Sequence, residues 1–66
     1  MVLKDMIQVL NIVAKYVEPS TEWLESGHDV IWLPLFEHHD VSDEDKARLE
    51  ELGASIGDSD CYEVCT

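Results

Sequence analysis

Apolar residues recur at steps of three and four through the first seventeen positions, a spacing that an α-helix places on one face. The residues on that face are Leu3, Met6, Ile7, Leu10, Val13, Ala14 and Val17. Further apolar residues widen it: Val2, Val9, Ile12 and Tyr16. We interpret this width as a helix that the rest of a small domain covers. Pro19 ends the helix, because proline has no N–H to donate and its ring clashes with the preceding turn.

The segment after Pro19 predicts one short helical turn. Ser20 or Thr21 can cap this turn, and Gly27 can end it by taking the left-handed conformation. We expect the neighbouring Trp23 and Leu24 to close one edge of the core.

Val30–Phe36 is a continuous apolar run whose β-branched and aromatic residues favour a strand. Pro34 cannot donate a ladder hydrogen bond, so the strand either ends near Pro34 or lies at an edge of its sheet. Both faces of the run are apolar. One face should meet the first helix, and Trp23 or a partner should cover the other.

Ser42 is expected to begin a second helix. Asp45 follows it by three residues in a variant of the capping box, and acids in the first turn suit the helix dipole. Leu49 and Leu52 form a narrow apolar stripe, and Gly53 ends the helix. We therefore predict a surface helix that shows water a mostly acidic face.

The tail Ala54–Thr66 predicts a β-hairpin around the turn-rich residues 57–60. Tyr62 and Val64 share one face of its second strand, which we expect to be the core face. The two cysteines and an acid share the other face. The resulting order is α-β-α-β-β, and we predict a single α+β domain over 1–66 with a three-stranded, largely antiparallel sheet and two principal helices packed on it. The strand order stays open.

Fifteen acids against four basic residues give a net charge of −11. Nucleic acid and anionic membranes both attract clustered lysine and arginine, so we expect neither to be a direct partner. A basic protein surface is the partner that this charge favours. No apolar run is long enough to span a membrane and the first residues lack the pattern of a signal peptide, so we expect a cytoplasmic monomer.

Residues that carry chemistry are present in unsuitable patterns. The three histidines and two cysteines could in principle supply four zinc ligands, but structural zinc sites use closer pairs such as C-x2-C. Cys61 and Cys65 would lie about 13 Å apart in a strand, which is too far for a disulfide. Glu37 and His38 are sequence neighbours and do not face each other. We therefore expect reduced thiols, no metal, no cofactor and no enzyme activity.

A charge of −11 exceeds the magnitude of about 2 to 8 that keeps a small domain soluble, which invites a functional interpretation. Phosphates along a DNA strand are about 6–7 Å apart. Carboxylates four residues apart on a helix, or two apart on a strand, have about the same spacing. The acids that we expect to contact a basic partner are Glu22, Glu25, Asp29, Glu37, Asp40, Asp43, Glu44 and Asp45.

A short, strongly acidic α/β chain without catalytic motifs resembles the anti-CRISPR proteins of the DNA-mimic kind that act on type I systems, including type I-C. The segment Ser42–Gly53, after Asp29–Pro34, is also similar to small phage reading frames. The resemblance implies an inhibitor in the bacterial cytosol whose acids block target-DNA binding by a CRISPR surveillance complex (Cascade). Such effectors hold nucleic acid in positively charged channels.

A second class of function stays open. An interaction module of the antitoxin or adaptor kind would bind through the apolar surface of the first helix and Trp32. Salt distinguishes the two, because charge mimicry weakens steeply as salt rises and an apolar interface does not.

Overall fold

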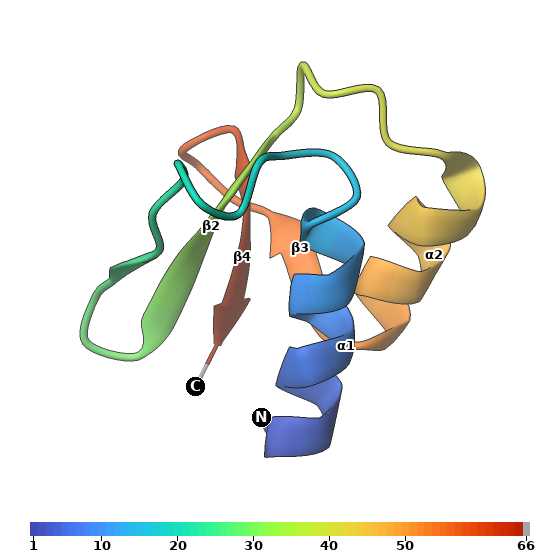
Figure 1. The fold of residues 1–66 in the computed structure, drawn as a ribbon. Coiled ribbons are helices and arrows are strands. Elements are labelled where there is room, and N and C mark those ends of the chain that lie inside the picture. Colours follow the sequence, from blue (N-terminus) through green and yellow to red (C-terminus); the bar gives the residue numbers. More distant parts are fainter. Residues whose placement is uncertain (66) are drawn as a thin grey trace.

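The computed structural model describes residues 1–65 and has the predicted α+β architecture, with one strand more than predicted (Figure 1). The elements in chain order are α1 (Leu3–Val13), β1 (Glu25–Ser26), β2 (Val30–Phe36), α2 (Asp43–Glu51), β3 (Ala54–Ile56) and β4 (Cys61–Cys65). The predicted hairpin extended to Thr66, which lies outside the described residues. None of the helices in this part of the chain is both long and apolar enough to cross a lipid bilayer.

The four strands form one antiparallel sheet in the order β1-β2-β4-β3. The additional strand is β1, and it replaces the helical turn predicted after Pro19. Gly27 does not end a helix; its N–H donates to the carbonyl oxygen of Val30 at 2.8 Å and closes the β1–β2 hairpin. A Cβ at Gly27 would lie 2.8 Å from the Trp32 ring, so glycine leaves the indole room to lie against the hairpin.

Pro34 lies inside β2, which continues to Phe36. The pairing of β2 with β4 is regular up to Trp32 and shifts register before Phe36. On its other side β2 pairs with β1 only at Ile31 and Trp32. Pro34 therefore falls in an irregular stretch that has an open edge toward β1, where a residue without an N–H is tolerated.

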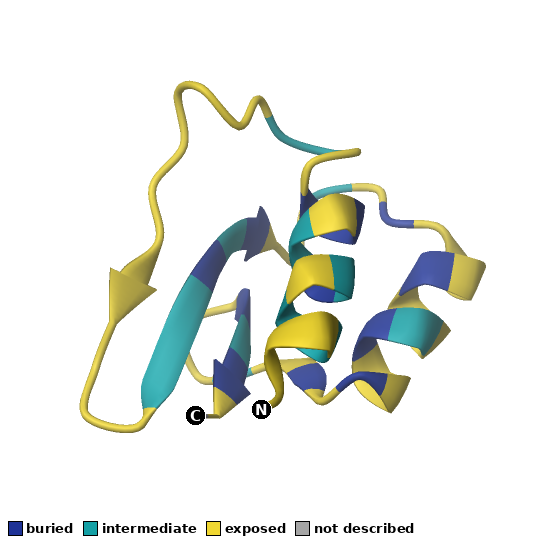
Figure 2. Ribbon diagram, turned by 60° about the horizontal axis from the view of Figure 1, so that its bottom comes forward, coloured by how far each residue is buried: buried dark blue, intermediate teal, exposed yellow. Residues whose placement is uncertain are grey.

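Both helices lie on the same face of the sheet, and the core lies between them and the strands (Figure 2). The core residues are Val9, Ile12, Val13, Leu33, Leu35, Val41, Leu49, Leu52, Ala54, Tyr62 and Val64. The predicted core face of β4 is thus confirmed, as is the apolar stripe of α2. The first helix is less covered than predicted, since Leu3 is 75% and Ile7 50% exposed.

The residues that connect α1 to β1 correct a second prediction. Trp23 and Leu24 do not close the core; Trp23 is 83% exposed and Leu24 is 52% exposed. The prediction failed because it assumed a helical turn, whereas residues 22–24 are irregular and lead into β1. One of the largest apolar side chains in the chain is therefore left at the surface.

Candidate functional site

The face of the sheet opposite the helices is the most distinctive surface of the molecule. Side chains alternate along a strand, so Leu33 and Leu35 point into the core while Trp32, Pro34 and Phe36 point to the other side. Trp32 and Pro34 are half-buried, and Phe36 is exposed. This face is aromatic, and none of the helices covers it (Figure 2). We call it the open face.

Two acids flank the aromatic centre of the open face. Trp32 pairs with Glu25 of β1 on one side and with Glu63 of β4 on the other. Residues directly opposite each other in an antiparallel pair share a face, with Cβ atoms about 4.5–5.5 Å apart. Trp32 therefore lies in a cross-strand row between Glu25 and Glu63. The Glu63 carboxylate also occupies the space that a side chain at Gly57 would need.

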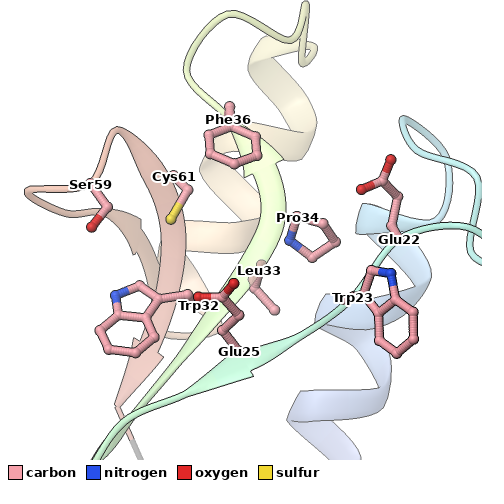
Figure 3. Close-up of a pocket in the computed structure, with 9 residues that line it drawn as sticks. All are labelled: Glu22, Trp23, Glu25, Trp32, Leu33, Pro34, Phe36, Ser59 and Cys61. Carbon is pink, nitrogen blue, oxygen red and sulfur yellow. The ribbon is translucent and has the colours of Figure 1, made fainter.

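The open face is hollowed into a groove of about 470 Å³. Figure 3 shows its lining residues: Glu22, Trp23, Glu25, Trp32, Leu33, Pro34, Phe36, Ser59 and Cys61. Trp32 and Trp23 stand on opposite sides of it, with Pro34 between them (Figure 3). The groove is shallow and apolar at its floor, and acids stand along its rim.

The two adjacent histidines extend this aromatic surface beyond Phe36. The ring centroids of His38 and His39 are 4.5 Å apart, and that of Phe36 is 5.6 Å from His38. On an extended chain, these two neighbours would point to opposite sides. Residues 37–39 instead form a turn, in which the Phe36 N–H donates to Nδ1 of His39 at 2.9 Å.

Charge is distributed unevenly between the helices and the rest of the chain. All four cations lie in or just after a helix: Lys4, Lys15, Lys46 and Arg48. Six of the fifteen acids are also helical, and the other nine lie in residues 16–42 and 52–65, which contain no lysine or arginine. Those nine acids are Glu18, Glu22, Glu25, Asp29, Glu37, Asp40, Asp58, Asp60 and Glu63. The open face therefore lies in the strongly negative part of the molecule.

The structure brings together some of the acids predicted to contact a partner. Glu22 and Glu25 line the groove, and Glu37 lies at its Phe36 end in a neighbouring hollow. The others are distributed elsewhere: Asp29 in the β1–β2 turn, Asp40 in the connection to α2, and Asp43 and Glu44 in the first turn of α2.

Glu63 was not among the predicted acids, although it flanks Trp32. The alternation of the tail had placed it on the non-core face, and only the pairing of β4 with β2 brings it beside the tryptophan.

Asp45 corrects the prediction that every acid of the α2 first turn faces a partner. It is buried, and its Oδ2 accepts a hydrogen bond from Lys15 Nζ at 2.8 Å and another from the Tyr16 hydroxyl. The bond from Lys15, followed by that from Tyr16, lowers the pKa of Asp45 below its usual value. Asp45 therefore joins α2 to the end of α1 and has a structural role.

The capping of α2 is accordingly only half of a capping box. The Ser42 hydroxyl accepts from the Asp45 N–H at 3.2 Å, as predicted. The reciprocal bond is replaced, because the Ser42 N–H donates to the Tyr16 hydroxyl at 3.2 Å. Tyr16 thus takes the place that the capping-box acid would have.

The cysteines lie on the open-face side of β4 in different environments. Neither forms a disulfide; Cys61 is buried beside the groove and Cys65 is exposed. Burial, with the nearby Glu63 charge as a smaller cause, raises the pKa of the Cys61 thiol above its usual value. Among residues 1–65, histidine, cysteine and acidic side chains form no group of three that could hold a metal ion.

Comparison of the chain with protein-family models, with curated proteins and with solved structures finds no match. The fold and the open face described above are therefore the basis on which a function can be argued.

Proposed function

We propose that this protein binds a basic surface of another protein and blocks the access of nucleic acid to that surface. The observation that supports this is the concentration of nine acids, without one lysine or arginine, in residues 16–42 and 52–65. A surface of this kind attracts arginine and lysine at long range and repels phosphate. Following the resemblance to DNA-mimic anti-CRISPR proteins, we propose a type I CRISPR surveillance complex as the target.

The helical side supports the same proposal by contrast. There two of the four cations pair with acids of their own chain: Lys15 binds Asp45 at 2.8 Å, and Arg48 binds Glu51 at 3.1 Å. Among the described residues, no salt bridge joins the nine acids of residues 16–42 and 52–65 to a lysine or arginine of the chain. A partner's basic residues would supply the compensation that the chain itself does not.

The test is a gel shift of target DNA by a purified type I surveillance complex, with this protein titrated at low and at moderate salt. We expect DNA binding to be lost at low salt and restored as salt rises. A triple variant on the groove side, E22Q/E25Q/E37Q, should inhibit less than the matched variant D43N/E44Q/E50Q, which removes the same charge from α2. DNA binding that this protein leaves unchanged at low salt would contradict the CRISPR target.

One observation favours the second class of function, an interaction module that binds through apolar contacts. Leu3 and Ile7 are exposed one helical turn apart on α1, and together they form a small apolar surface. α1 covers one face of the sheet and Trp32 lies on the other, so this surface and Trp32 are separate on the molecule. Substitution of Ile7 by Asp tests it: partner binding should fall sharply and show little dependence on salt.

A further inference from the structure

We propose that the open face is a docking site for an arginine side chain of the basic partner, with the guanidinium stacked on Trp32 between Glu25 and Glu63. This inference rests on the proposed function and specifies the contact that it would use. It requires three features of the surface: an accessible ring, carboxylates on both sides of it, and no cation of the chain itself in competition.

The row Glu25–Trp32–Glu63 supplies the ring and the acids on both sides of it. The indole face attracts a cation through its quadrupole, and a planar guanidinium can lie flat on it. Five N–H donors extend from the guanidinium in its own plane, so that they can reach carboxylates on neighbouring strands while the plane remains stacked. The ammonium of lysine is a compact point charge that lacks this geometry. The site should therefore prefer arginine to lysine.

The groove supplies the room. Its volume of about 470 Å³ exceeds what one side chain occupies, and Trp23 and Pro34 are part of its apolar lining (Figure 3). An apolar wall suits the methylene stem of an arginine, which buries its carbons while the charged end remains at the acids. The exposed Trp23 and Phe36 would then be covered on binding.

The negative charge around the groove favours a basic protein segment over other occupants. The acid rim repels nucleic-acid phosphates, so stacking of bases on the tryptophans is opposed. A second copy of the chain would bring a further charge of −11 to the same face. The chain's own cations cannot fill the site, because all four lie in or just after a helix, on the other side of the sheet.

The experiment measures binding of two fluorescein-labelled peptides by anisotropy at low salt. One contains four arginines separated by Gly-Ser, and the other contains four lysines in the same positions. We expect the arginine peptide to bind at least about five-fold more tightly. In a ¹H–¹⁵N spectrum, the Trp32 indole N–H should shift more with the arginine peptide than with the lysine peptide at equal saturation.

Matched variants separate the site from the general field of the protein. E25Q/E63Q should lose about ten-fold or more in affinity for the arginine peptide, and D29N/D58N, with the same charge, should lose about three-fold or less. Trp32→Leu should remove the preference for arginine but leave binding of the lysine peptide, and its circular dichroism should match that of wild type.

The outcomes distinguish failure of this site from failure of the proposed function. Equal binding of both peptides, or equal losses in the two double variants, would overturn the arginine site and leave a diffuse electrostatic attraction intact. If neither peptide bound at low salt, the arginine site and the proposed function would both be contradicted. If Trp32→Leu does not fold, the indole shift of the wild-type protein and the two double variants still test the site.

Discussion

The uncompensated acids should make the stability of this protein depend strongly on salt. We treat the net charge of −11 as spread over a sphere of radius about 13 Å, half of the 28 × 24 × 24 Å extents of the fold. The unfolded chain has a radius of gyration of about 25 Å, so its charges repel each other less. Raising the ionic strength from about 10 to about 100 mM shortens the Debye length from about 30 to about 10 Å.

With these radii, screening reduces the repulsion in the folded state more than in the unfolded state, by about 3 kcal/mol. In a domain of this size each kcal/mol of stability raises the melting temperature by about 4–8 °C. The melting temperature should therefore rise by roughly 12–24 °C between the two salt concentrations. Thermal unfolding followed by circular dichroism at neutral pH measures it.

Two controls test whether repulsion is the cause. Sodium chloride and tetramethylammonium chloride should act alike, because screening does not depend on which cation is present. In the variant D29N/D40N/E50Q/D58N all four changes are at exposed positions and reduce the net charge from −11 to −7. Repulsion scales with the square of the charge, so the salt effect should fall to about 40% of the wild-type value. A wild-type rise below about 3 °C would refute the reasoning and show that the acids are compensated.

Three further predictions concern the core, the thiols and the contact between the helices. Leu35→Ala should destabilise the fold by about 2–5 kcal/mol, because Leu35 is fully buried, whereas Leu24→Ala at an exposed site should cost about 0.5 kcal/mol or less; urea unfolding measures both. A thiol reagent should modify the exposed Cys65 quickly and the buried Cys61 slowly, and equal rates in the native protein would contradict the burial of Cys61. Because the folded-state pKa of Asp45 is lowered, its contribution to stability is present above the usual Asp pKa and is lost as pH falls through the folded value. The difference in stability between wild type and D45N should therefore be constant near neutral pH and shrink below about pH 3.8; a difference unchanged at pH 2 would be inconsistent with this contact.

Sequence patterns of short range predicted most of the fold correctly. Three elements are favoured by their own residues and could be predicted from them. They are α1 from its helical period, α2 from the cap at Ser42, and β4 from its alternation. The strand β1 was missed because Glu25 and Ser26 have no strand pattern of their own, and only their pairing with β2 defines them. Because the prediction placed a helical turn where β1 lies, it also wrongly expected Trp23 to be buried.

The candidate site depends on contacts between segments that are distant in sequence. Glu63 lies beside Trp32 only because β4 is next to β2, and the strand order stays open at the level of sequence. Burial of Asp45 likewise requires Lys15 and Tyr16, about thirty residues earlier, to meet α2. The acidity that suggests a basic partner was visible from composition, but the aromatic groove was not.

The separation of charge between the helices and the rest of the chain gives the molecule a permanent electric dipole. In the field of a basic partner, such a dipole experiences a torque as well as an attraction. The sheet would turn toward the partner before the two surfaces touch, and the helices would trail behind. A larger share of encounters would then begin in a productive orientation, so the placement of four cations on the helical side would increase the association rate without touching the partner.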